Sequence, residues 1–60
     1  MGRILTGEIK EEFEKEFNVE ADSIIILIDT KKKIASYILD ATKRIEDDYE
    51  KILKYYNEKI

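Results

Sequence analysis

Two short apolar runs separated by a charged break constrain this chain most strongly. Residues 24–28 read Ile-Ile-Ile-Leu-Ile, and an apolar run of this length, rich in β-branched residues, is typical of a strand buried on both faces. Residues 29–32 read Asp-Thr-Lys-Lys; Asp and Thr bond nearby backbone groups in turns, and lysines need water. Residues 34–39 then alternate as a second strand does. The pattern predicts a β-hairpin with strands near residues 23–29 and 33–39.

An amphipathic pattern precedes the hairpin. Ile9, Phe13 and Phe17 recur every four residues, which gives one apolar stripe on a helix. Thr6 is a suitable N-cap for this helix. Asn18 can adopt the left-handed conformation that ends a helix. We therefore expect a helix between these two residues, preceded by an ordered lead-in, residues 1–5, whose type the sequence does not define.

A second amphipathic pattern follows the hairpin. Asp40 is a suitable N-cap, and the apolar spacing after it predicts a helix of about twenty residues. The stripe of this helix comprises Ile45, Tyr49, Ile52, Leu53, Tyr56 and Ile60. Tyrosines at such spacing are more often packing residues at a core edge or interface than platforms for nucleic-acid bases.

The resulting prediction is one α+β domain, residues 1–60, with the order helix, strand, strand, helix. The alternative is an all-α fold, because residues from about Ser23 to Lys59 also keep the three-four spacing of a long helical hairpin. That alternative places Lys31 and Asp48 in the apolar seam. A helix also rarely runs so long without tertiary support, so we favour the β-hairpin.

Size and composition restrict what can stabilise the fold. A chain of 60 residues buries only roughly 60% of its unfolded surface. It contains no Cys and no His, which excludes disulfides and the common zinc sites, so oligomerisation is the remaining means of stabilisation. Neither a membrane-spanning run nor a signal-peptide pattern is present, and we expect a cytoplasmic protein. The 42% of charged residues and the absence of Pro favour a thermophilic source.

The stretch from Phe17 to Ala41, FNVEADSIIILIDTKKKIASYILDA, resembles the opening of a roadblock domain. This is the fold of the dynein light-chain roadblock proteins and of bacterial and archaeal regulators of small GTPases. The similarity lies in Val19, the apolar strand 24–28, Asp29 and the Ile-Ala-Ser run at residues 34–36. The glycine common in the family's turn is replaced here by Lys31 or Lys32, and the similar region corresponds to about the first half of the family's domain. The resemblance implies one helix on each face of the hairpin and a small GTPase as a partner.

A hairpin this apolar needs cover on both faces and partners on both edges. We therefore expect a homodimer in which the free edge of strand 24–28 pairs antiparallel with its symmetry mate. The residues expected in the core or in the dimer interface are Ile24, Ile26, Ile28, Ile45, Tyr49, Ile52 and Tyr56.

Residue chemistry argues against an enzyme. The chain has no His, Cys or Gly-rich phosphate loop, so we expect no catalytic, cofactor or metal site. The expected function is a non-enzymatic, dimeric interaction module, a roadblock-like scaffold or regulator of a small GTPase. The alternative is a small dimeric transcription regulator or antitoxin. A net charge of −3 disfavours nucleic acid, and the lysines at 31–33 are expected to form a solvated hairpin tip.

Overall fold

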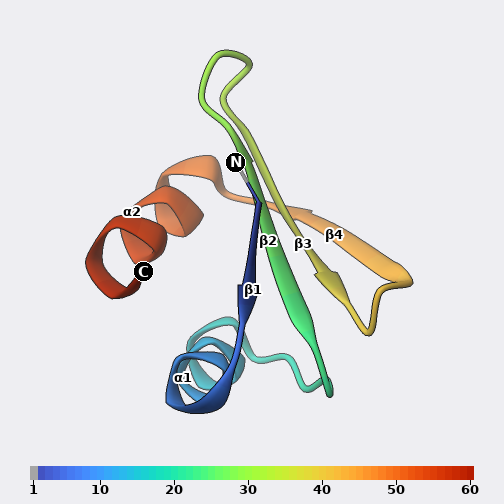
Figure 1. Ribbon diagram of the computed structural model, residues 1–60. Helices are drawn as coiled ribbons and strands as arrows, with labels where there is room; N and C mark the ends of the chain where they lie inside the picture. Colours follow the sequence, from blue (N-terminus) through green and yellow to red (C-terminus); the bar gives the residue numbers. More distant parts are fainter. Residues whose placement is uncertain (1) are drawn as a thin grey trace.

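The central β-hairpin lies where the sequence predicts it. A computed structural model describes residues 2–60 (Figure 1). Strand β2 (Ile24–Asp29) pairs antiparallel with strand β3 (Ile34–Leu39), with Ile26 opposite Tyr37. The predicted strands near residues 23–29 and 33–39 are therefore confirmed.

The turn between β2 and β3 is held by the carboxylate of Asp29. Its Oδ1 accepts hydrogen bonds from the backbone N–H groups of Lys31 and Lys32, both at 3.0 Å. The Lys32 bond is the main cause that holds the pKa of the Asp29 carboxyl below its usual value. Lys33 then closes the turn with a left-handed φ of 55°. This confirms the expectation that the Asp side chain folds back onto the turn.

Two further strands extend the hairpin on both sides. Strand β1 (Gly2–Leu5) pairs with the outer edge of β2, and strand β4 (Lys43–Asp47) pairs with β3. The result is one antiparallel sheet with the order β1-β2-β3-β4. The predicted α+β class is confirmed, and the all-α helical hairpin is wrong. Of the lead-in, residues 2–5 form β1, and residue 1 lies outside the described part of the chain.

The edge-to-edge dimer expected from the sequence is also wrong in its stated form. Leu5 pairs with Ile24 and Gly2 with Leu27, so β1 already occupies the edge of β2 that a symmetry mate was expected to fill. The chain completes that side of its sheet by itself.

A tight turn replaces the predicted start of the second helix. Asp40 and Ala41 have left-handed φ values of 53° and 60°, and the Thr42 N–H donates to the Leu39 carbonyl at 3.1 Å. Two successive positive φ values are the requirement of a type I′ hairpin turn. The chain therefore returns as β4 instead of entering a helix at Asp40.

The helix that follows is shorter than predicted. Helix α2 (Tyr49–Lys59) begins after Asp48, whose Oδ1 accepts the N–H of Glu50 at 3.1 Å. Asp48 is therefore the N-cap, in place of Asp40. A cap satisfies one of the backbone N–H groups that a helix start leaves without a partner.

Helix α1 (Gly7–Phe17) begins and ends at the residues that the sequence predicts, although the Thr6 side chain makes no capping hydrogen bond. It begins after Thr6, and Asn18 ends it with φ 54° and ψ 50°, in the left-handed region. The Asn18 N–H donates to the Glu14 carbonyl. The carboxylate of Glu14 in turn accepts the Ala21 N–H at 3.1 Å, which fixes the connection into β2.

Both helices pack on the same face of the sheet (Figure 1). The rings of Phe13 and Phe17 on α1 lie within 5.8 Å of both Tyr37 on β3 and Tyr55 on α2, centroid to centroid. The Tyr55 hydroxyl donates to the Ile9 carbonyl at 2.8 Å. The structure thus corrects the expectation, implied by the resemblance, of one helix on each face.

The core lies between this helical layer and the sheet. Its largest fully buried apolar side chains come from α1, β2 and α2, and are Phe13, Ile24, Ile26 and Ile52. Other buried apolar residues complete it, namely Leu5, Phe17, Ala21, Ile28, Ala35, Tyr37, Leu39 and Tyr55.

Replacing Ile26 by Asp should unfold the protein. Ile26 is 0% exposed, so the substitution removes apolar burial worth about 2–5 kcal/mol and places a carboxylate where no water reaches it. A domain of this length has a total stability of only a few kcal/mol. Circular dichroism should show loss of the fold, whereas the matched variant Ile34→Asp, at a position 37% exposed, should stay folded. A folded Ile26→Asp protein would contradict the assigned core.

Replacing Ala41 by Gly should stabilise the protein. An L-residue in the left-handed region costs about 1–2 kcal/mol, and Gly removes this cost while losing more entropy on folding. We expect a net gain of about 0.5–1 kcal/mol in the free energy of unfolding, measured by denaturant titration. If residue 41 were helical, the same change would instead cost about 1 kcal/mol. Ala35→Gly, at a buried strand position, is the control that should destabilise.

Candidate functional site: the open face of the sheet

Within residues 2–60, no helix covers the second face of the sheet. Ile25, Leu27 and Ile38 alternate with core residues along β2 and β3; they are only half-buried and do not belong to the core packing. Ile4 is 64% exposed and Ile34 is 37% exposed on the same side. We call this surface the open face. By strand register it comprises Gly2, Ile4, Ile25, Leu27, Asp29, Ile34, Ser36, Ile38, Arg44 and Glu46.

The register arranges most of the open face in two rows that cross all four strands. The first row, from β1 to β4, is Ile4, Ile25, Ile38 and Arg44. The second row, in the same direction, is Gly2, Leu27, Ser36 and Glu46. Both rows are uncharged from β1 to β3 and end in a charged residue on β4. The two end charges are opposite in sign.

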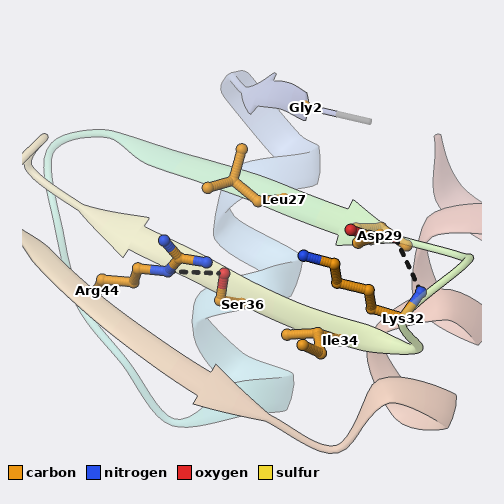
Figure 2. A pocket seen from close by; sticks show the side chains of 8 residues that line it. Gly2, Leu27, Asp29, Lys32, Ile34, Ser36 and Arg44 are labelled. Carbon is orange, nitrogen blue, oxygen red and sulfur yellow. Dashed lines mark hydrogen bonds between the residues drawn. The ribbon is translucent and has the colours of Figure 1, made fainter.

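A hollow of about 480 Å³ lies on this face, near the turn between β2 and β3 (Figure 2). The only buried polar residue found among residues 2–60, Ser36, is 1% exposed and lines this hollow. Its hydroxyl accepts a hydrogen bond from Nε of Arg44 at 3.2 Å. The guanidinium therefore lies across β3, and Arg44 is held over the sheet instead of extending into solvent.

Charged side chains border the apolar part of the hollow. Figure 2 shows the Lys32 side chain extending from the turn over the strands, while the carboxylate of Asp29 faces the turn backbone. Leu27 and Ile34 form the apolar walls. The open face is therefore an apolar surface with a polar border, and the hollow is a shallow part of it that opens to solvent.

The residues singled out in the sequence lie on the opposite side of the sheet. Ile24, Ile26, Ile28 and Ile52 are buried beneath the helices. Ile45, Tyr49 and Tyr56 are half-buried and pack against that core. None of the seven belongs to the open face.

The sequence analysis predicts no site on the open face, although the apolar pattern of residues 24–28 indicates such a face. In the run 24–28 every residue is apolar, so Ile25 and Leu27 must point away from whatever covers Ile24 and Ile26. The partial burial of Ile38 follows from the same alternation in β3. The contributions of Gly2, Ile4 and Arg44 carried no such signal, because β1 and β4 were not predicted.

The aromatic residues are not available to stack on nucleic-acid bases at the open face. Tyr37 and Tyr55 are each 3% exposed on the helical side, where burial raises the pKa of both hydroxyls. The two rows of the open face hold no aromatic residue. Proteins that bind single strands on a sheet use exposed aromatic platforms there, so the expected role of the tyrosines in packing is the one that the structure supports.

Within residues 2–60, no group of three or more His, Cys, Asp or Glu residues could hold a metal ion. Neither of the two helices in the described part is long and apolar enough to cross a membrane. The open face offers apolar contact, with the charged residues Lys32, Arg44 and Glu46 at its border.

Comparison with protein-family models, with curated proteins and with solved structures finds no match for this chain.

Proposed function

We propose that this chain is a non-enzymatic interaction module that binds protein through the open face of its sheet. The observation that carries the proposal is the apolar character of a face that no helix of residues 2–60 covers. Contiguous exposed apolar surface bordered by polar residues marks protein interaction sites in soluble domains. Ile4 is 64% exposed and adds to the apolar surface at the β1 side of this face.

The composition of the two faces supports the same proposal. The helical layer covers Ile24, Ile26 and Ile28, but Ile25 and Leu27 on the other side of β2 are equally apolar. Antiparallel sheets that face water on one side normally carry polar residues there. An open face with five Ile or Leu side chains is therefore suited to being covered by another protein surface.

The roadblock resemblance suggests the class of one partner, a small GTPase, as the target of a scaffold or regulator. The layer arrangement that the resemblance implies is not found, so this partner rests on residues 17–41 alone. The transcription-regulator alternative has less support, because the chain is acidic and DNA binding depends on contacts of basic residues to phosphate.

The double variant Ile4→Lys with Ile34→Lys should lose protein binding while keeping the fold. Both side chains are exposed, so the substitutions place two charges on the open face at little cost to the monomer. We expect partners captured by the wild-type protein to bind the variant at least about tenfold more weakly, because desolvating a lysine opposes an apolar contact. Quantitative affinity capture, followed by binding titration with each purified partner, measures this.

A variant on the helical side serves as the matched control. Glu8→Lys with Glu11→Lys changes two exposed residues of α1 and should leave capture unchanged. Equal capture by all three proteins would contradict the proposal. Retardation of DNA with a steep dependence on salt would instead favour the transcription regulator, since such a slope reports contacts to phosphate.

The lysines of the hairpin tip should not be required for binding. Lys31, Lys32 and Lys33 are all exposed, and the turn is held by Asp29 and backbone groups. The triple change to Ala should therefore leave the binding of a small GTPase within about twofold, because exposed charges contribute little to binding. Loss of binding would place the site at the tip.

A further inference from the structure

We propose that the partner of the open face is a second copy of this chain, packed face to face with its strands running in the reverse direction. The inference rests on the proposed docking role of the open face and names its occupant. In this arrangement the two-fold axis lies between the two open faces. It runs perpendicular to the strands, midway between the two rows. Each row then lies opposite the other row of the second copy.

The side chains of the two rows complement each other in size under this symmetry. Ile4 of one copy lies over Gly2 of the other, so the most exposed apolar side chain meets the position that has no side chain. On β2, Ile25 lies opposite Leu27. On β3, the large Ile38 lies opposite the small Ser36, which becomes accessible once the Arg44 guanidinium leaves its hydroxyl. Along β1, β2 and β3, each large side chain therefore faces either a small residue or an apolar side chain of similar size.

The fourth strand supplies charge complementarity. Arg44 ends the first row and Glu46 ends the second, so the same axis places Arg44 of each copy opposite Glu46 of the other. Two opposite-sign contacts form per dimer. A symmetry axis along the strands would instead place β4 over β1, where Arg44 would meet Ile4 and Glu46 would meet Gly2. The charges therefore favour the axis that crosses the strands.

The ends of the sheet are complementary in the same sense. The lysines at 31–33 lie at one end of the β2-β3 pair, and Asp22 and Asp40 lie at the other end, just outside Ile24 and Leu39. Reversing the strand direction brings the lysine end of each copy against the aspartate end of the other. Packing with strands in the same direction would instead bring lysine against lysine.

The edges of the sheet are less suited to self-association than its face. Four of the five residues of β4 are charged, and β1 has only four residues and carries Arg3. Short and charged edge strands are the usual protection against edge-to-edge pairing.

The size of the face predicts a dimer that dissociates on dilution. Four strands about 4.8 Å apart and six residues of about 3.3 Å each give a face of roughly 19 by 20 Å. Two such faces in contact bury roughly 800 Å² in total, which is the size of a weak, transient interface.

Sedimentation of the charge-reversed variants tests the arrangement. The wild-type chain of 7.1 kDa should form a concentration-dependent dimer. Arg44→Glu and Glu46→Arg should each weaken dimerisation by about tenfold or more, because each places like charges opposite one another. Mixing the two single variants should restore dimerisation, since one copy then has two acids and the other two bases at these positions. The double variant Arg44→Glu with Glu46→Arg should also dimerise.

Lys43→Glu is the matched control, because it changes charge by the same amount as Arg44→Glu on the neighbouring residue, whose side chain lies on the other side of β4. It should leave dimerisation unchanged. A wild-type protein that stays monomeric would overturn the proposed arrangement. So would a dimer that neither single reversal weakens, with no gain in dimerisation when the two variants are mixed. If dimerisation fails but capture of other proteins still depends on Ile4 and Ile34, only this inference fails. If capture is also independent of them, the docking role fails as well.

Discussion

The contact of Tyr55 with helix α1 decides how the layers of this protein are arranged. Its ring lies 5.3 Å from that of Phe13, at an interplanar angle of 77°, and its hydroxyl donates to the Ile9 carbonyl at 2.8 Å. Edge-to-face ring pairs and a satisfied hydroxyl together make Tyr a suitable residue for joining two elements at a core. Because Phe13 also meets Tyr37 on β3, both helices are fixed over the same side of the sheet. The other side is left to face solvent or a partner.

The features that the sequence predicted correctly are those determined within a few residues of one another. A helix over the run 24–28 would leave most of its β-branched residues outside the apolar seam, and Asp29 bonds the turn that directly follows the run. Asn18 ends α1 through its own tolerance of the left-handed region. Each of these depends on the side chain concerned and its immediate neighbours, which is why pattern and propensity sufficed.

The turn at Asp40 and Ala41 was not predictable because its sequence is atypical. A type I′ turn normally carries Gly at the second central position, and Ala41 adopts φ 60° there without that freedom. The backbone of this turn is supported from elsewhere, since the Asp40 carboxylate accepts the N–H groups of Asp22 and Ser23 at 2.8 and 3.1 Å. Such support comes from residues 17 and 18 positions away. Only the folded arrangement shows it.

The sequence prediction also missed strand β4 and assigned the wrong buried face to α2. Ile45 is the only apolar residue of β4, and its spacing to Tyr49 and Ile52 also fits a helix, so periodicity alone extended the helix backwards. That phase placed Tyr56 in the stripe and left Tyr55 outside it, whereas Tyr55 is the buried one. The open face depends on β1 and β4 as much as on the predicted hairpin. Its apolar centre was therefore visible in the sequence, but its charged border was not.

The order of the four strands explains why the uncovered apolar area lies on the open face and not at an edge. The outer strands occupy the edges that the apolar hairpin would otherwise expose, and most of their own residues are charged or small. This protects the backbone groups at the edges but adds no cover to Ile25, Leu27 and Ile38. Arg44 partly compensates by lying over Ser36, and its aliphatic stem can cover apolar surface while its charge stays at the border. A sheet built in this way has short, charged edges and one covered face, so its remaining apolar area is concentrated on a single surface bordered by the charges of β4.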